Sequence, residues 1–264
     1  YQIKVSEIIE ILTLCGFAFF AGLIDAVVGG GGLVQLPAML IILPQTAIAS
    51  ILGTSKFVSM AGTAIAVNQY AKQQKIDWQT TIPAMVTAFV FSFLGARITS
   101  LLNPSLMRPV ILVLLIAVAI YTFSKKDFGL LQSLKVSKSR QYFYSIAIGS
   151  TIGFYDGFFG PGTGSFLIFA FTSVFGYSFL TASAAAKVIN FATNLAAVIY
   201  FGFSKHILYY LGIPMAICNI FGAFIGANLA ISKGSQFVRK LFLIIVSSLI
   251  LKLGYDIFII KYGK

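Results

Sequence analysis

The chain has 264 residues, of which 58% are hydrophobic and only 10% charged, and its formal net charge is +12. A soluble domain carries about 25% charged residues, so this composition excludes a soluble globular enzyme, and the high apolar content throughout excludes disorder. The apolar runs are continuous and about twice as long as the alternating strands of an outer-membrane barrel, which leaves an all-α polytopic membrane protein. We therefore assign the basic residues to helix orientation and anionic lipid headgroups, and not to nucleic acid.

The apolar stretches, taken in chain order, have two lengths. Eight are long enough to cross a bilayer, which takes about 20 residues: 8–28, 47–71, 80–101, 106–123, 142–159, 179–203, 207–231 and 237–260. Two shorter stretches, 33–43 and 165–175, follow glycine-rich breaks and would span only about 16 Å at about 1.5 Å per residue. We predict about eight transmembrane helices and two half-helices.

A repeat with a constant offset of 131 residues relates the two halves of the chain. Residues 22–108 match residues 153–239 without a gap, and the matches include an Asp, a Lys, a Pro and several Gly. Apolar stretches share Leu, Ala and Val by chance but rarely share these residues. We predict a duplicated four-helix unit, with a first repeat at 1–124, a cytoplasmic linker loop at 125–141 and a second repeat at 142–264. Secondary transporters commonly have such repeats, with the site near the midplane.

The direction of the second repeat relative to the first stays open at this point. Four crossings in each repeat would make the repeats parallel, whereas a re-entrant hairpin of the first helix and its short partner would leave three crossings and make them inverted. In both arrangements Lys and Arg are in excess on the side of the central loop. We therefore predict that this loop is cytoplasmic and that the protein lies in the cytoplasmic (plasma) membrane.

Two glycine-rich breaks, Gly29–Gly32 and Gly160–Gly164, occupy the same position in the two repeats. Glycine inside a helix costs about 1 kcal/mol relative to alanine, so such runs unwind the chain and leave backbone N–H groups that need a partner. The N-terminus of the short helix after each break favours an anion, while close helix packing is the alternative. We assign to the substrate site Gly30, Gly31, Gly32, Gly162, Thr163 and Gly164.

Two lysines lie near the middle of long apolar stretches, Lys56 in 47–71 and Lys187 in 179–203. A lysine at mid-bilayer costs at least about 2.5 kcal/mol, so each needs a partner or an aqueous cavity. Polar residues follow at i+3 and i+7 on the same helix face. We favour a cavity over an ion pair within the bundle, because a pair would not need these additional substrate-site residues: Ser59 and Thr63 after Lys56, and Asn190 and Asn194 after Lys187.

Asp25 and Asp156 each lie one helical turn before a glycine-rich break. Each could pair with a lysine, carry a proton, bind Na⁺ together with unwound carbonyls, or cap the half-helix that follows. Ion coupling by H⁺ or Na⁺ and structural pairing are both retained. We predict neither a metal nor a cofactor.

The motif residues resemble the TauE/SafE sulfite-exporter family of duplicated membrane permeases. The resemblance is carried by Gly22–Pro37 with Thr54–Lys56, and in the second repeat by Tyr155–Gly164. It extends over nearly the whole chain and implies transport of a small sulfur-containing anion such as sulfite, sulfoacetate or another organosulfonate. The residues themselves indicate only that the substrate is a small anion.

The family's motif Asp and Lys correspond here to Asp25, Lys56, Asp156 and Lys187. The family's glycine turns correspond to the two glycine-rich breaks. The second break departs from a pure glycine run at Pro161 and Thr163, so the two halves of the site need not be equivalent.

Two other functions use the same kinds of residues. An uncoupled anion channel would employ paired lysines and helix N-termini equally well. Aspartyl intramembrane proteases also place two aspartates in the membrane but need Gly-x-Gly-Asp, whereas both aspartates here stand in Gly-x-x-Asp. The chain has no phosphate-binding Gly-x-x-x-x-Gly-Lys-Ser/Thr motif. We predict a secondary transporter, not an enzyme or a primary pump, with its anion bound between the repeats. The sequence does not define an oligomeric state.

Overall fold

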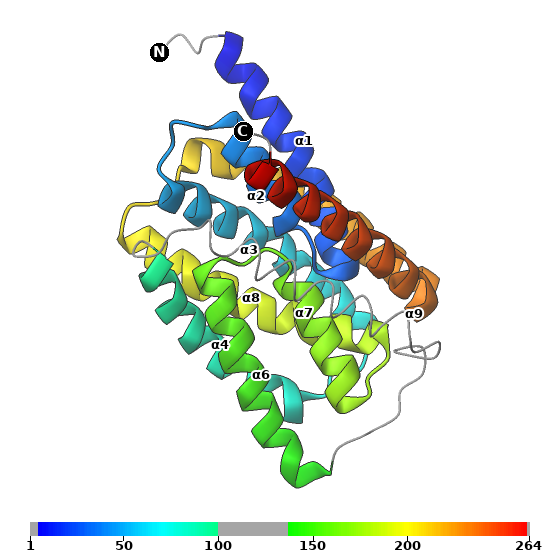
Figure 1. The fold of residues 1–264 in the computed structure, drawn as a ribbon. Helices are drawn as coiled ribbons and strands as arrows, with labels where there is room; N and C mark the ends of the chain where they lie inside the picture. The colour runs from blue at the N-terminus through cyan, green and yellow to red at the C-terminus, as the bar shows by residue number, and fades with distance from the viewer. Residues whose placement is uncertain (1–4, 100–136, 263–264) are drawn as a thin grey trace.

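The computed structural model describes residues 5–99 and 137–262, and all the regular structure in these two ranges is helical (Figure 1). The predicted all-α fold is therefore confirmed for the described residues. The helices are α1 Val5–Val28, α2 Gly32–Ile42, α3 Ile48–Gln73, α4 Trp78–Ile98, α6 Lys138–Phe158, α7 Thr163–Ala170, the π-helix η3 Phe171–Phe175, α8 Phe179–Phe203 and α9 Tyr209–Tyr262. The expected span 106–123 and most of the linker 125–141 lie outside the described residues, and α6 begins within that linker.

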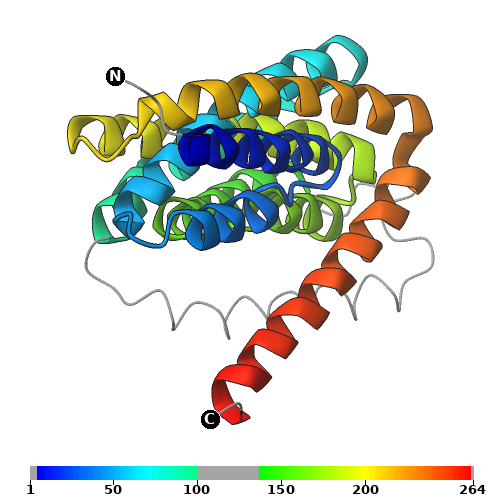
Figure 2. The ribbon, with the colours of Figure 1, turned by 90° about the horizontal axis from the view of Figure 1, so that it is seen from above.

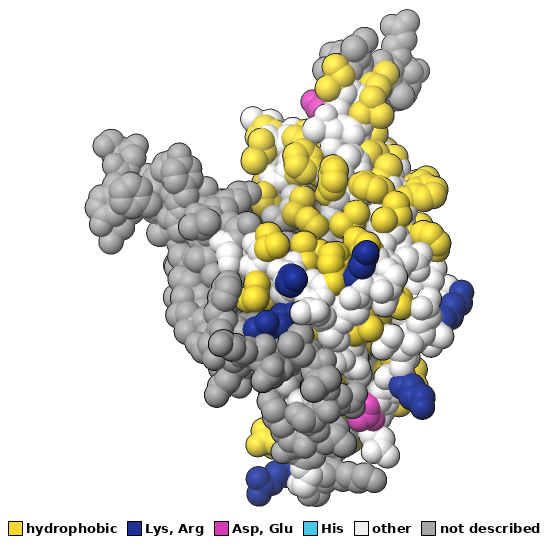
Figure 3. Space-filling view, turned by 90° about the vertical axis from the view of Figure 1, so that its right-hand side faces the viewer, with side chains coloured by type: hydrophobic (Ala, Val, Ile, Leu, Met, Phe, Trp, Pro, Cys, Tyr) yellow, Lys and Arg dark blue, Asp and Glu magenta, His cyan; other side chains and the backbone are white. Residues whose placement is uncertain are grey.

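Five of the described helices are long and apolar enough to cross a membrane: Glu7–Val28, Ile48–Gln73, Trp78–Ile98, Phe179–Phe203 and Tyr209–Ile244. Large apolar side chains such as Phe20, Val90 and Phe221 are exposed on their outer faces. Figure 3 shows hydrophobic side chains spread over one face of the molecule, with few Lys and Arg among them. An apolar surface of this extent is suited to contact with lipid tails.

The last two expected spans, 207–231 and 237–260, correspond to two helical segments that meet at a kink and share one label. They form α9, which changes direction at Gly234, where φ is +75°. The separation that the sequence predicted is therefore present, because the backbone at Gly234 is not helical and glycine accepts this conformation. Seen from above, the part of α9 after this point leads away from the bundle (Figure 2).

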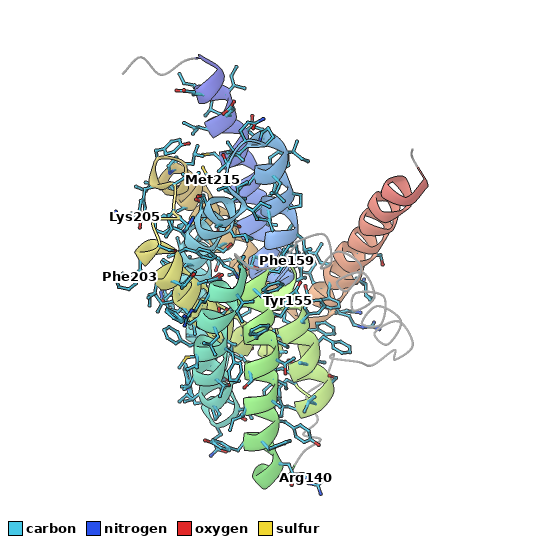
Figure 4. All side chains as sticks on the ribbon, turned by 60° about the vertical axis from the view of Figure 1, so that its left-hand side comes forward. Arg140, Tyr155, Phe159, Phe203, Lys205 and Met215 are labelled. Carbon is cyan, nitrogen blue, oxygen red and sulfur yellow. The ribbon has the colours of Figure 1, made fainter. Side chains whose placement is uncertain are left out.

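The two short apolar stretches form half-length helices, as predicted. α2 has 11 residues, and α7 has 8 residues and continues into η3. The hairpin of α1 and α2 enters the bundle from one end and the hairpin of α6 and α7 from the other (Figure 1). In Figure 4, Arg140 marks the outer end of α6, while Tyr155 and Phe159 lie near the middle of the molecule.

The tips of the two hairpins meet inside the bundle. The backbone N–H of Ser165 donates a 3.1 Å hydrogen bond to the Gly29 carbonyl oxygen, and its Oγ donates a 2.7 Å bond to the Val28 carbonyl oxygen. A Cβ atom built on Gly29 would overlap the backbone of Gly164. Glycine at these two positions therefore permits the direct backbone contact between the breaks.

The long helix of each hairpin packs along a helix from the other half of the chain. α1 lies along α9, and α6 lies along α4. A Cβ atom on Gly22 would overlap the Asn219 carbonyl oxygen, and one on Gly95 would overlap the Phe154 carbonyl oxygen, so the paired helices are in backbone contact. α3 and α8 contact each other and lie between these two helix pairs, which places their middle turns beside the hairpin tips.

Candidate functional site

A pocket lies where the two hairpin tips meet α3 and α8. Its wall includes apolar side chains such as Leu36, Leu52 and Phe159 beside many polar groups. Most of the residues that the sequence assigned to the site line this pocket: Asp25, Gly32, Lys56, Ser59, Asp156, Gly162, Thr163, Gly164, Asn190 and Asn194. The assigned residues outside its wall are Gly30, Gly31, Thr63 and Lys187.

Two ion pairs connect the halves of the chain beside the pocket. Lys56 Nζ on α3 lies 2.7 Å from Asp156 Oδ1 on α6, and Lys187 Nζ on α8 lies 3.1 Å from Asp25 Oδ2 on α1. Each pair joins a lysine of one half to an aspartate of the other. The ion-pair alternative that the sequence left as the second choice is therefore present for both lysines.

The pair of Lys56 and Asp156 belongs to the pocket wall on both sides. The two side chains are 9% and 2% exposed. Asp156 Oδ2 is buried and has no hydrogen-bond partner among the described residues, which is costly for a carboxylate oxygen. Gly160, with φ at +93°, leaves room for the ammonium group, because a Cβ there would lie 2.6 Å from Lys56 Nζ.

The pair of Lys187 and Asp25 is arranged differently. Lys187 is fully buried, whereas the Asp25 side chain is 18% exposed and lines the pocket. Lys187 Nζ also donates to the backbone carbonyl oxygen of Asp25, which accepts a second bond from the Gly29 N–H at 2.8 Å. Lys187 thus caps the last turn of α1, where the helix dipole favours a cation.

The two half-helices begin at the pocket without side-chain caps. The residues at their N-caps are Gly31 for α2 and Gly162 for α7, and neither helix has a side-chain cap hydrogen bond. The capping role that the sequence allowed for the aspartates is therefore not observed. Several of the first N–H groups are bonded to backbone carbonyls instead, since Leu33 donates to Gly30 and Thr163 to Gly160. The dipole of each half-helix still directs partial positive charge toward the hairpin tips.

Hydroxyl and amide groups complete the polar wall. Ser59, Asn190 and Asn194 line the pocket, and Asn194 Nδ2 donates a 3.3 Å bond to Asn190 Oδ1. Thr63 is the exception, because its Oγ1 donates to the Ser59 carbonyl oxygen at 2.6 Å inside α3. The stripes predicted on α3 and α8 therefore reach the pocket, except for Thr63 and Lys187.

Sequence reasoning missed a polar network behind the pocket. Gln35 on α2 is fully buried, and its Nε2 donates to the carbonyl oxygen and the Oγ of Ser55 at 3.1 and 3.0 Å. Asn219 Nδ2 on α9 donates to Gln35 Oε1 at 3.4 Å and to the Ala18 carbonyl oxygen at 2.8 Å. Ser55 lines the pocket, so this network helps to fix the turn of α3 that carries Lys56. A lone glutamine inside a short apolar stretch was the available signal.

Comparisons with known proteins show which sequences this chain resembles. The model of a family described as sulfite exporter TauE/SafE matches residues 14–253. A probable membrane transporter protein, ORF9 of Sinorhizobium sp., is 32% identical over 90% of each chain, and one of Haemophilus influenzae is 30% identical over 95% of this chain and 96% of its own. The probable membrane transporter protein YfcA of Escherichia coli is 28% identical over 92% of this chain and 90% of its own. No solved structure matches the chain significantly.

Proposed function

Because this chain belongs to the sulfite exporter TauE/SafE family, and is thus an integral membrane transporter and not an enzyme, we propose that it is a secondary transporter of a small sulfur-containing anion. The family description names sulfite, and the relatives are named only as transporters. The cytoplasmic membrane is the proposed location, with the central loop on the cytoplasmic side because Lys and Arg are in excess there.

The observation that carries this proposal is the pocket between the hairpin tips. It combines the ammonium group of Lys56, the amides of Asn190 and Asn194 and the positive end of the α7 dipole in the interior of an apolar bundle. Charge-assisted and backbone N–H donors suit an oxyanion whose oxygens spread the negative charge. We infer that Lys56 contacts the anion directly and that Lys187 contributes through Asp25.

We also infer that the chain consists of two inverted repeats, with the anion held between them near the membrane midplane. The two hairpins enter from opposite ends (Figure 1). Within the described ranges, α3 begins at 48 and α8 at 179, and α4 begins at 78 and α9 at 209, so both pairs have the 131-residue offset of the sequence repeat. Inverted repeats support alternating access by movement of one unit against the other.

The aspartates are the candidates for ion coupling by H⁺ or Na⁺. Export of an anion is favoured by an interior-negative membrane potential, which is worth about 2.3 kcal/mol per charge per 100 mV. Import works against this potential and needs a co-transported cation. The proposal therefore includes a coupling role for Asp25 or Asp156 when the anion is accumulated.

Transport into liposomes that contain the purified protein tests this function. We expect saturable transport of sulfite or an organosulfonate, and little competition from acetate or chloride. We also expect the anion to accumulate under an imposed proton or Na⁺ gradient. Lys56→Ala should abolish it, while Lys205→Ala, a change at an exposed loop residue, should not. Anion flux that follows the potential and never responds to either gradient would favour the channel alternative.

A further inference from the structure

The two ion pairs differ in how many contacts hold each lysine. Lys187 Nζ reaches two oxygens of Asp25, one in the carboxylate and one in the backbone, and it is fully buried away from the pocket wall. Lys56 Nζ reaches one carboxylate oxygen of Asp156 and itself lines the pocket. Lys56 is therefore accessible to an anion in the pocket, whereas Lys187 is not.

The charge of the site restricts how that approach occurs. With both pairs closed, the charges of the two lysines and the two aspartates sum to zero. An anion beside Lys56 would then also lie near two negatively charged carboxylates. A proton on Asp156 removes one of these negative charges and leaves the Lys56 ammonium for the anion. Asp156 Oδ2 has no partner among the described residues, so a proton can bond there while Oδ1 keeps its place beside α3.

The ionisable groups around Asp156 are consistent with this role. α3 contributes Lys56, which is paired with Asp156. α1 contributes Asp25 from the other side of the pocket, and Asp25 is paired with Lys187 of α8. On its own helix, Tyr155 donates its hydroxyl to the Pro161 carbonyl oxygen at 2.7 Å. α4 carries Arg97, which does not line the pocket, and α7 has no ionisable residue.

We propose that the pair of Lys56 and Asp156 is the one that opens: Asp156 Oδ2 takes a proton as the anion binds to Lys56 Nζ, while the pair of Lys187 and Asp25 stays closed and holds the tip of α1. This inference rests on the proposed transport function and deepens it. No covalent bond other than the O–H bond forms, and the proton comes from water. A monovalent anion then crosses together with one positive charge, so its accumulation depends on the pH gradient and not on the membrane potential.

Calorimetry on the purified full chain in lipid nanodiscs tests the assignment. The probes are methanesulfonate, 2-hydroxyethanesulfonate and sulfate, which stay ionised near neutral pH, so that any proton taken up on binding goes to the protein. Titrations in buffers of different ionisation enthalpy give the number of protons. We expect about one proton per bound monovalent anion for the parent protein and for the control Glu10→Gln, a change at an exposed carboxylate outside the pocket. Because Asp25 lines the pocket, Asp25→Asn is compared only in the number of protons per anion that it still binds. Asp156→Asn should bind the anion with no proton uptake and with affinity that no longer varies with pH.

An infrared difference spectrum gives a second readout. Addition of the anion should produce the carbonyl stretch of a protonated carboxylic acid in the parent protein and in Asp25→Asn, and not in Asp156→Asn. If Asp156→Asn does not fold, Asp156→Glu is measured instead. The frequency of the carboxylic acid carbonyl stretch should then change only if residue 156 carries the proton. A band that does not move overturns the inference.

The other outcomes separate the two levels of the argument. Anion binding by the parent protein without proton uptake, or proton uptake that is lost in Asp25→Asn and kept in Asp156→Asn, overturns the inference and leaves the transport function standing. A parent protein that binds none of these anions and no sulfite contradicts the proposed function, and the inference fails with it.

Discussion

The hairpin of α1 and α2 and the hairpin of α6 and α7 have the same plan but are held differently at their tips. The last carbonyls of α1 accept hydrogen bonds from the other half of the chain: Asp25 from Lys187, and Val28 and Gly29 from Ser165. Residue 34, which corresponds to Ser165 in the repeat, is valine, so the opposite tip has no equivalent hydroxyl.

The tip of α6 is held mainly by its own neighbours. Thr163 Oγ1 donates to the Gly160 carbonyl oxygen at 2.7 Å, and Tyr155 donates to Pro161 within the same hairpin. Thr99, just beyond α4, donates to the Phe158 carbonyl oxygen at 2.8 Å. Both tips thus have bonds across the repeat interface, but the end of α1 depends on Ser165 and Lys187 of the second half, whereas the tip of α6 combines internal bonds with those from Thr99 and Lys56. The two glycine-rich tips have similar sequences at equivalent repeat positions, but they are held by different contacts.

The largest effect on stability should come from Lys187→Ala. Removing one partner of a buried ion pair typically costs about 3–5 kcal/mol, because the other charge stays buried without compensation. Thermal unfolding in nanodiscs should show a strongly lowered midpoint, and the double change Lys187→Ala with Asp25→Ala should recover part of the loss. A midpoint equal to that of Lys205→Ala would show that Lys187 does not anchor α1.

Lys56→Ala should weaken anion binding, and it should also lower stability, because Asp156, whose side chain is 2% exposed, loses its counter-charge unless it takes up a proton. A charge-assisted hydrogen bond contributes about 1.5–3 kcal/mol, which corresponds to a loss of about 10- to 100-fold in affinity. Lys56→Arg should recover little, since a planar fork does not replace a compact ammonium group. Calorimetric titration with a sulfonate measures the affinity, and unfolding of the same sample gives its stability. A greater loss of stability than for Lys187→Ala would reverse the comparison between the pairs.

Ser165→Ala should destabilise the protein by about 1–3 kcal/mol, because the Val28 carbonyl oxygen loses its hydroxyl donor in a buried position. The backbone bond from residue 165 to Gly29 remains, so the tips should stay together. Unfolding midpoints measure the effect, with Ser173→Ala as the control, since Ser173 Oγ donates to the Phe169 and Ala170 carbonyl oxygens of the preceding turn. Equal effects of the two changes would contradict an anchor across the interface.

Thr163→Val should have the smallest effect, about 0.5–1.5 kcal/mol. The change keeps the shape of the side chain and removes only its bond to Gly160 within the same hairpin. It should shift the unfolding midpoint less than Ser165→Ala does, and anion affinity should fall slightly because the residue lines the pocket. A larger shift than that of Ser165→Ala would show that the α6 tip is the more strongly held one.

Local sequence features predicted much of the site. Glycine-rich breaks followed by short apolar stretches predicted α2 and α7, and the spacing of Ser59, Asn190 and Asn194 predicted the face that reaches the pocket. Helix periodicity and glycine conformational preferences act over a few residues, so a single sequence carries them. The same local reasoning separated the last two apolar stretches, and the helix is interrupted between them at Gly234.

The roles of the two lysines could not be predicted in the same way. Lys56 and Lys187 have equivalent positions in the repeat, but one lines the pocket and the other is fully buried. That difference depends on contacts between α1 and α8 and between α3 and α6, which bring together residues from opposite halves of the chain. Gln35 is a similar case, because its partners Ser55 and Asn219 come from α3 and α9.

The exchange of charges between the halves also has a consequence for biosynthesis. Asp25 precedes its lysine by 162 residues, and at about 5–20 residues per second a ribosome needs roughly 8–32 s to make that interval. During this time Asp25 and Lys56 have entered the membrane without the partners that neutralise them in the finished protein, an expensive condition in lipid. The inserted first half must therefore be kept near the translocation machinery, or surrounded by water, until translation of the second half supplies both counter-charges.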